Sequence, residues 1–184
     1  MQEEHRGDFF TDLLKFAALA LIIVIPIRLF VAQPFIVSGA SMEPTFQNSQ
    51  YLIVDELSYH FEQPQRGDVI VFRYPKDPSE FFIKRIIGLP NETVKISSGN
   101  VYIVAQNGKS EELSEPYVVN KGNGPDMSVT LGPEEYFVMG DNRPESSDSR
   151  LWGTLPRQNI IGHVFLRLLP VSSVGILPGA TVVQ

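Results

Sequence analysis

Ser41 is one residue of this sequence that could do covalent chemistry. It lies in the segment VSGASMEPTF, residues 37–46, directly after a long apolar run. A serine becomes a nucleophile only when a neutral base lies within hydrogen-bond reach of its hydroxyl. The pattern is not a nucleophile elbow, because that motif needs glycine where this chain has Glu43. The three histidines are remote in sequence. The residues alone therefore favour a turn residue before Pro44, with a nucleophile as the alternative.

A pair of cations, Lys84 and Arg85, interrupts the otherwise apolar run FFIKRIIG, residues 81–88. Successive side chains of a strand point to opposite faces, so one of the two cations must point along a largely buried face or into a cleft. One interpretation is a lysine at a sheet edge whose amine reaches water. The other is a desolvated lysine, whose pKa falls toward neutrality so that the amine can act as a general base.

The polar stretch MGDNRPESSDSRLWG, residues 139–153, is the third candidate. One interpretation is a long turn held by Asp–Arg pairs and side-chain-to-backbone hydrogen bonds. A tight polar cluster of this kind is also a common support for a functional site.

The apolar run over residues 13–32 is the strongest physical signal. It carries only Lys15 and Arg28, both near its ends, and has about the 20 residues that cross a bilayer core. A cleaved targeting sequence is disfavoured, because the run is long and follows acidic as well as basic residues. A buried core helix would be apolar around its whole circumference. We therefore expect a membrane anchor over residues 12–32 after a short cytoplasmic segment, residues 1–11, and the charge rule slightly favours this orientation.

Beyond the apolar run, short strand-like runs are separated by Gly, Pro, Asn and Asp. TVKIS alternates with period two, and the following SSGN and VYIV predict a hairpin. Residues 106–128 are polar and indicate an exposed excursion. We expect a mainly β fold, an antiparallel sheet domain over residues 33–184 with one N-terminal transmembrane helix. The predicted strands are residues 51–55, 68–73, 81–88, 92–97, 101–105, 135–140 and 160–169.

The composition excludes several kinds of site. The chain has 184 residues and a net charge of −6, which argues against a nucleic-acid-binding protein, because such proteins show a basic face. It has no cysteine, so disulfides, thiolate zinc sites and cysteine nucleophiles are excluded. The sequence also carries no motif for a metal or a nucleotide.

Four motifs, taken in order with the apolar run, resemble type I signal peptidases, the membrane-anchored Ser-Lys proteases that remove signal peptides from exported proteins. The motifs are SMEPT, RGDVIVF, KRIIGLPNE and GDNRPESSDSRLWG, and the resemblance runs from the anchor to about Phe165. Each motif alone is weak, whereas four in the family's order are highly specific. The resemblance implies a serine endopeptidase that needs no cofactor and no metal.

The resemblance implies that Ser41 is the nucleophile and Lys84 the general base of a Ser-Lys dyad. The two residues are far apart in sequence, so the fold must bring them together. The apolar neighbours of Lys84 agree with this role, since burial lowers the pKa of a lysine. By the same resemblance Ser146 orients the base, with Ser147 as the adjacent alternative.

The resemblance places the oxyanion hole around Ser41 and Gly39. The backbone N–H of Ser41 would be the first donor to the developing oxyanion. Some family members add a serine hydroxyl two positions earlier, where this chain has Gly39 and lacks that hydroxyl. A backbone N–H, a water molecule or Ser38 could take its place, and the sequence leaves these alternatives open.

Two further sets of residues follow from the resemblance. The family prefers small residues, typically Ala, at the first and third positions before the cut, which requires shallow apolar pockets. The matching pocket residues are Val37, Met42, Phe82 and Ile83. Structural ion pairs would hold the Ser146 loop against Lys84, and they correspond to Arg85, Asp141, Asp148 and Arg150.

The implied partners are the signal peptides of preproteins and the lipid bilayer, with the protein export machinery as a further candidate and no nucleic acid. The substrate would bind extended, as a strand added to a sheet edge. The implied location is the cell membrane, with a single span, the N-terminus in the cytoplasm and the β domain on the outer face. Phe46, Phe81 and the residues around Val37 would then rest on the membrane.

Other functions fit parts of the pattern. The main alternative is a membrane-tethered β domain that binds exported chains without cutting them, although degenerate relatives normally lose the serine or the lysine. A self-cleaving Ser-Lys regulator is disfavoured, because such proteins are usually soluble and carry a DNA-binding domain. A purely structural anchor protein would make the four ordered motifs a coincidence.

Overall fold

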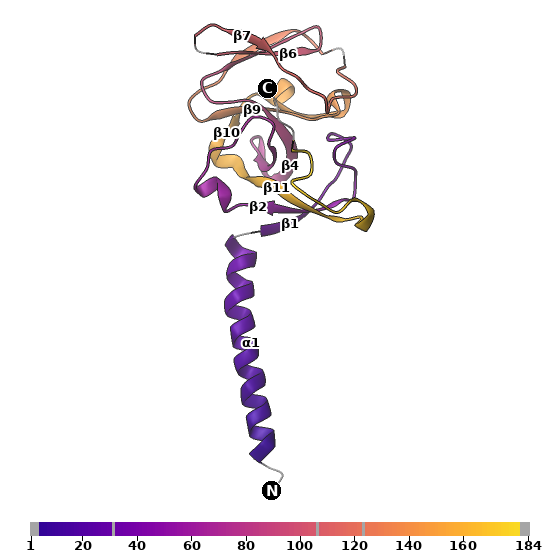
Figure 1. Cartoon of the computed structure of the whole chain (residues 1–184). Helices are drawn as coiled ribbons and strands as arrows, with labels where there is room; N and C mark the ends of the chain where they lie inside the picture. The colour runs from indigo at the N-terminus through magenta and orange to yellow at the C-terminus, as the bar shows by residue number, and fades with distance from the viewer. Residues whose placement is uncertain (1–3, 31, 106, 123, 181–184) are drawn as a thin grey trace.

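The computed structural model describes residues 4–30, 32–105, 107–122 and 124–180, and Figure 1 shows a long helix that projects away from a β-rich body. The helix is α1 (Glu4–Phe30), and the strands all follow it in the chain. Residues 1–3 of the predicted cytoplasmic segment and residue 31 of the predicted anchor lie outside the described residues.

Helix α1 begins earlier than the predicted anchor, and its 27 residues form a rod of about 40 Å. Its large apolar side chains are exposed where they are described, among them Leu14, Phe16 and Ile22. Lys15 pairs with Asp12 at 3.2 Å, whereas the side chain of Arg28 lies outside the description. Within the described part of the chain, no helix has the length and apolar character that a membrane crossing requires.

The larger of two sheets has eight strands, and every neighbouring pair in it is antiparallel. The order is β1-β2-β11-β3-β4-β9-β10, with β12 also paired to β11. In this order β3 and β4 are central, so neighbouring strands cover both of their edges. The bounds are β1 (Ala32–Ile36), β2 (Tyr51–Asp55), β3 (Val69–Tyr74), β4 (Asp77–Gly88), β9 (Glu135–Met139), β10 (Leu155–Pro156), β11 (Ile160–Leu169) and β12 (Gly175–Ile176).

The smaller sheet has four antiparallel strands in the order β7-β6-β5-β8. Its central hairpin turns through Ser98 and Gly99, which both have positive φ, at 50° and 78°. This is the two-residue turn whose twist matches that of the flanking strands, as the SSGN motif predicts. The bounds are β5 (Thr93–Ser97), β6 (Asn100–Val104), β7 (Ser110–Glu112) and β8 (Met127–Thr130).

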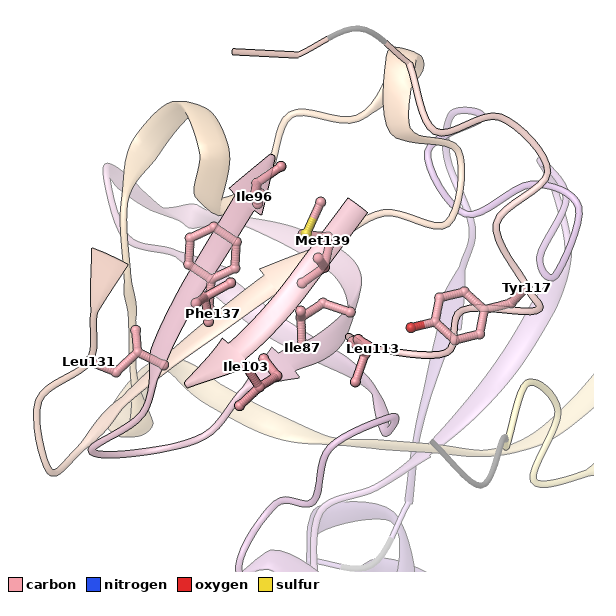
Figure 2. Packing of buried hydrophobic residues seen from close by; sticks show 10 residues of the cluster. Ile87, Ile96, Ile103, Leu113, Tyr117, Leu131, Phe137 and Met139 are labelled. Atoms are coloured by element: carbon pink, nitrogen blue, oxygen red, sulfur yellow. The ribbon is translucent and has the colours of Figure 1, made fainter. Parts of the chain in front are cut away.

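The two sheets share a buried apolar cluster, which Figure 2 shows from close by. Ile87 of β4 and Phe137 of β9 pack there against side chains from β5 and β6, such as Ile96 and Ile103. Two more clusters bury the faces of β3 and β4: one contains Val37, Phe46 and Val71, and the other contains Ile70, Phe72 and Ile86. The central strands are therefore buried on both faces, which positions β4 rigidly.

Short helical segments connect the strands. They are η1 (Ser58–His60), η2 (Arg143–Glu145), α2 (Ser149–Trp152), η3 (Arg157–Asn159) and η4 (Val171–Ser173). η2 and α2 both lie in the stretch 139–153 that the sequence singled out, so this stretch is a structured loop after β9.

The structure confirms the predicted antiparallel, mainly β fold. β2 and β11 have the predicted bounds, and the other five predicted runs each overlap one strand that differs at one or both ends. The prediction of an exposed excursion over residues 106–128 is wrong in part. β7 lies wholly within it and β8, at the opposite edge of the same sheet, begins in it. Leu113 and Tyr117 are buried in the shared cluster. The few apolar residues of this segment pack against the smaller sheet. The polar composition of the segment as a whole did not indicate this packing.

Candidate active site

Ser41 lies in the turn between β1 and β2, and the loop after β9 holds its backbone. The Asn142 N–H donates to the Ser41 carbonyl at 3.0 Å, and the Asn142 side-chain amide donates to the Ala40 carbonyl at 3.1 Å. Gly39 has a φ of +93°, a conformation that favours glycine, and it bends the chain just before Ser41. The backbone that carries the Ser41 hydroxyl is therefore fixed by contacts from a distant segment.

Lys84 reaches Ser41 directly from the buried half of β4. Its Nζ lies 2.8 Å from Ser41 Oγ and 2.8 Å from the Ile83 carbonyl oxygen. The residue is only 4% exposed, and the neighbouring Arg85 is also buried. The sequence pattern required one buried cation; the structure buries both, because packed side chains cover both faces of β4.

Burial lowers the pKa of Lys84 from its ordinary value of 10.5 to about 8, whereas the charges of Asp148 and Asp141 oppose this shift. The ring of Phe82 contributes to the enclosure, with its centroid 5.3 Å from Lys84 Nζ. A lysine with this pKa is partly neutral at mildly alkaline pH and can accept a proton. Lys84 and Ser41 together have the geometry of a base and the hydroxyl that it activates.

Ser146 is buried in the loop after β9, and its hydroxyl donates to Asp148 Oδ2 at 2.6 Å. Asp148 also accepts the Gly140 N–H at 3.0 Å and pairs with Arg150 Nε at 2.8 Å. The base-orienting role of Ser146 stays a prediction, because the hydrogen bond of its hydroxyl runs to Asp148. The adjacent Ser147 is exposed and lines the cleft beside the dyad.

Gly140 separates the backbone of Ser41 from the Ser146 side chain. An ideal Cβ at Gly140 would lie 2.3 Å from Ser146 Oγ and 2.4 Å from the Ser41 carbonyl oxygen. No side chain fits there, so the turn that carries Ser41 and the Ser146 loop approach each other closely only because this residue is glycine.

A fully buried ion pair supports the turn that carries Ser41 from the other face of β4. Arg85 donates through Nε and Nη2 to the two carboxylate oxygens of Asp141, at 2.9 and 2.6 Å. Both side chains are 0% exposed. The Thr45 hydroxyl donates to Asp141 Oδ2 at 2.6 Å, so the pair is joined to the turn that carries Ser41. The Arg85 guanidinium also lies over the Tyr117 ring, 4.0 Å from its centroid.

A cleft of about 350 Å³ opens beside the dyad, lined mainly by residues 35–41 and 80–84. Of the predicted pocket residues, Val37, Phe82 and Ile83 line it. Met42 is not among the lining residues: it is 1% exposed and packs in the core cluster with Val37, because the turn directs it inward. Its role as a pocket residue stays a prediction.

The aromatic side chains behind the cleft fix Phe82. Its ring stacks on Tyr74 with centroids 4.6 Å apart and contacts Phe72 edge-on at 6.2 Å. Trp152, the only tryptophan of the chain, packs against both Tyr74 and Phe72. The loop that carries Ser146 and the strand that carries Lys84 are thus joined by ring contacts as well as by ion pairs.

The structure narrows the alternatives for the second oxyanion donor. The Gly39 N–H donates to the Asn48 side-chain oxygen at 3.0 Å, so it is engaged within the turn. Ser38 and Ser41 both line the cleft. Gly39 has no side-chain hydroxyl, so the Ser38 hydroxyl stays a candidate for the second oxyanion donor.

Several supporting residues were not singled out by the sequence. Thr45, Gly140 and Asn142 lie inside the recognised motifs, which offered a signal for each of them. Glu115 had none: it lies in the polar excursion, yet it forms a buried ion pair with Arg143, whose Nε donates to the Gly140 carbonyl at 3.0 Å. Among the residues described, no group of three or more His, Asp or Glu side chains could hold a metal ion.

Three comparisons show which known proteins the chain is similar to. The profile of the family described as signal peptidase, peptidase S26, matches residues 10–169. A probable signal peptidase I-1 of a Synechocystis species is 41% identical over 182 residues, covering 95% of this chain and 90% of the relative. A signal peptidase I of Leptolyngbya laminosa is 42% identical over 174 residues, covering 88% and 81%. A crystal structure of a signal peptidase I from Enterococcus faecalis V583 is 35% identical with a TM-score of 0.46, covering 55% of this chain and 97% of that chain.

These matches define the class of the protein as a serine endopeptidase, a hydrolase of peptide bonds. The chain belongs to the signal peptidase family, peptidase S26. The resemblance found in the four sequence motifs is confirmed.

Replacing Gly140 with alanine should lower activity by about 10²-fold, because the added methyl group must displace Ser41 or Ser146, and small displacements of reacting groups have effects of this size. The measurement is kcat/KM for peptide cleavage by the folded, full-length variant. Gly124→Ala is the matched control, since a Cβ there has no neighbour within 4 Å. Parental activity of Gly140→Ala would contradict the close approach of the two segments.

Proposed function

We propose that this chain is a membrane-anchored endopeptidase that removes signal peptides from exported preproteins, with Ser41 as nucleophile and Lys84 as general base. One observation carries the proposal: the buried Lys84 amine lies 2.8 Å from the Ser41 hydroxyl, beside an apolar cleft. Membership of the S26 family and relatives named signal peptidase I support the substrate class.

The mechanism follows from the protonation state of Lys84. The neutral amine accepts the Ser41 proton as Oγ attacks the scissile carbonyl carbon, and the Ser41 N–H donates to the resulting oxyanion. The Lys84 ammonium then gives its proton to the leaving amine, which frees the mature protein and leaves the signal peptide as an ester on Ser41. Neutral Lys84 next takes a proton from water, the water oxygen attacks the ester, and the proton returns to Ser41 Oγ.

Specificity for small residues before the cut would arise from the apolar wall of the cleft. Val37, Phe82 and Ile83 line it, and the rings of Tyr74 and Phe72 back Phe82. A rigid wall of this kind leaves little room for a large side chain, whereas alanine fits. An extended substrate segment would lie along residues 35–37, whose strand β1 is at an edge of the larger sheet.

The proposal includes an anchor over residues 12–32, a cytoplasmic N-terminus and a β domain, residues 33–184, on the outer face. Its support is the apolar run of the sequence and the exposed apolar side chains of α1. The set of membrane-contacting residues needs correction: Phe46 and Val37 are buried in the core and cannot rest on a bilayer. Phe81 and Ile36, next to Val37, are 44% and 67% exposed and stay in the set.

Ser41→Ala and Lys84→Met should each lower cleavage by at least about 10³-fold, because one removes the attacking oxygen and the other removes the base while keeping much of the side-chain volume. The measurement is cleavage of a membrane-reconstituted preprotein by the full chain, with circular dichroism to show folding. Lys95→Met, at an exposed lysine of β5, is the control and should cut like the parent. Cleavage by Lys84→Met would show that another group is the base.

The activity should rise with pH and level off above about 8. Protonated Lys84 cannot accept the Ser41 proton, so kcat/KM should fall about tenfold per pH unit below the Lys84 pKa of about 8. The folded-state pKa lies below the ordinary 10.5, so the unfolded chain binds the proton more tightly, and the free energy of unfolding should increase between about pH 8 and 10.5. A flat kcat/KM profile from pH 6 to pH 9 would refute the assignment of the base.

The anchor and its orientation can be tested on the full chain expressed in bacterial cells. The chain should stay with the membrane fraction after alkaline carbonate extraction, because an inserted helix is not held by charge. Protease added to spheroplasts should digest the β domain. Release into the supernatant would contradict the anchor, and a β domain protected until the cells are lysed would contradict the orientation.

A further inference from the structure

The C-terminal segment, residues 170–180, lies beyond the family match, which ends at residue 169. It nevertheless folds back onto the domain, since its strand β12 pairs with β11 through Leu166–Ile176 and Arg167–Gly175. The Leu177 N–H then donates to the Phe165 carbonyl at 2.7 Å. This hairpin directs the following residues toward the underside of the turn that carries Ser41.

Gly179 makes the decisive polar contact of the segment. Its carbonyl accepts Arg85 Nη1 at 2.6 Å, and the same guanidinium binds both oxygens of Asp141. Asp141 in turn accepts the Thr45 hydroxyl. A continuous set of hydrogen bonds therefore runs from the end of the described chain, through the buried ion pair, to the nucleophile turn.

Gly179 also packs directly against that turn. An ideal Cβ would lie 2.8 Å from Thr45 Cγ2 and 3.0 Å from Phe46 Cε2, and its φ is +81°, which favours glycine. Arg167 of β11 makes a second connection: its guanidinium donates to the Thr45 carbonyl at 3.0 Å and to the Ser173 carbonyl at 2.7 Å. The Thr45 side chain thus faces Gly179, and its backbone carbonyl is bound by Arg167, the β11 residue that pairs with Gly175.

We propose that the C-terminal segment positions the active site, with Gly179 as a positioning residue that fixes the Ser41 turn through Arg85, Asp141 and Thr45. The inference rests on the proposed role of Ser41. A buried guanidinium needs an acceptor for its N–H groups, and loss of one acceptor forces the buried pair to rearrange. Because Thr45 is bound to that pair, the rearrangement moves the turn, and a shift of about 1 Å at a nucleophile lowers turnover strongly.

The test compares two truncations of the full chain. Truncation after Ala180 keeps Gly179, whereas truncation after Leu177 removes it but retains β12 and its pairing with β11. Cleavage of a signal-peptide substrate should keep kcat within twofold of the parent in the first variant. In the second, kcat should fall at least tenfold while KM changes less than twofold, because the cleft wall is built by other residues.

A second pair of variants keeps the chain length constant. Gly179→Ala introduces both the clash and the unfavourable φ, whereas Gly175→Ala is the control, since its nearest neighbour would be the Ser173 oxygen at 3.9 Å. Gly179→Ala should reproduce the loss of kcat at a temperature at which circular dichroism shows it folded. Gly175→Ala should behave like the parent.

The outcomes separate this proposal from the proposed function. Cleavage by the parent tests the function, and the ratio of kcat between the paired variants tests the positioning role. Equal kcat for the two truncations, or parental kcat for folded Gly179→Ala, would overturn the positioning role and leave the function standing. If truncation after Leu177 prevents folding, the folded Gly179→Ala variant decides.

Discussion

The burial of the Lys84 amine is the physical constraint on which the site depends. Removing a cation from water is costly in free energy. The two adjacent buried cations, Arg85 and Lys84, differ in the groups that compensate for this loss. Arg85 receives a carboxylate, two carbonyls and an aromatic ring, and so it is a structural cation. Lys84 receives the neutral oxygens of Ser41 and Ile83. The nearby carboxylates Asp141 and Asp148 are each paired with an arginine, which limits how strongly they stabilise the charged form of Lys84.

The two-sheet scaffold makes this arrangement rigid. β4 is central in the larger sheet, and clusters of apolar side chains cover both of its faces. The smaller sheet adds a third cluster behind β9, which anchors the strand from which the Ser146 loop emerges. Ion pairs then fix the loop itself, with Arg150 on Asp148 and Arg143 on Glu115. Rigid apolar packing places the backbone, and a small number of buried polar contacts set the final positions of the reacting groups.

The predictability of this structure differs between its local and non-local features. Alternating runs such as TVKIS predict the strands, because a half-buried strand alternates apolar and polar residues with period two. β1 was missed, since it is short, contains Pro34 and directly follows the apolar run. Ser41 and Lys84 came from motif resemblance, and their 2.8 Å separation could not be derived locally. The inward direction of Met42 could not be predicted, because a turn has no alternation from which to infer direction. The contacts of Glu115 and Gly179 join segments without any shared sequence pattern.

The order of these parts along the chain has a consequence for how the protein is made. Ser41 is synthesised early, Lys84 only after two further strands, and the loop with Gly140 and Ser146 near the end. Because the contacts between these segments are non-local, they form late in folding, after the cost of closing long loops has been met. In a nascent or partly folded chain, Ser41 therefore lacks its contact with Lys84. The Ser41–Lys84 contact arises only with completed tertiary structure, so a chain that has not finished folding lacks the geometry of the candidate site.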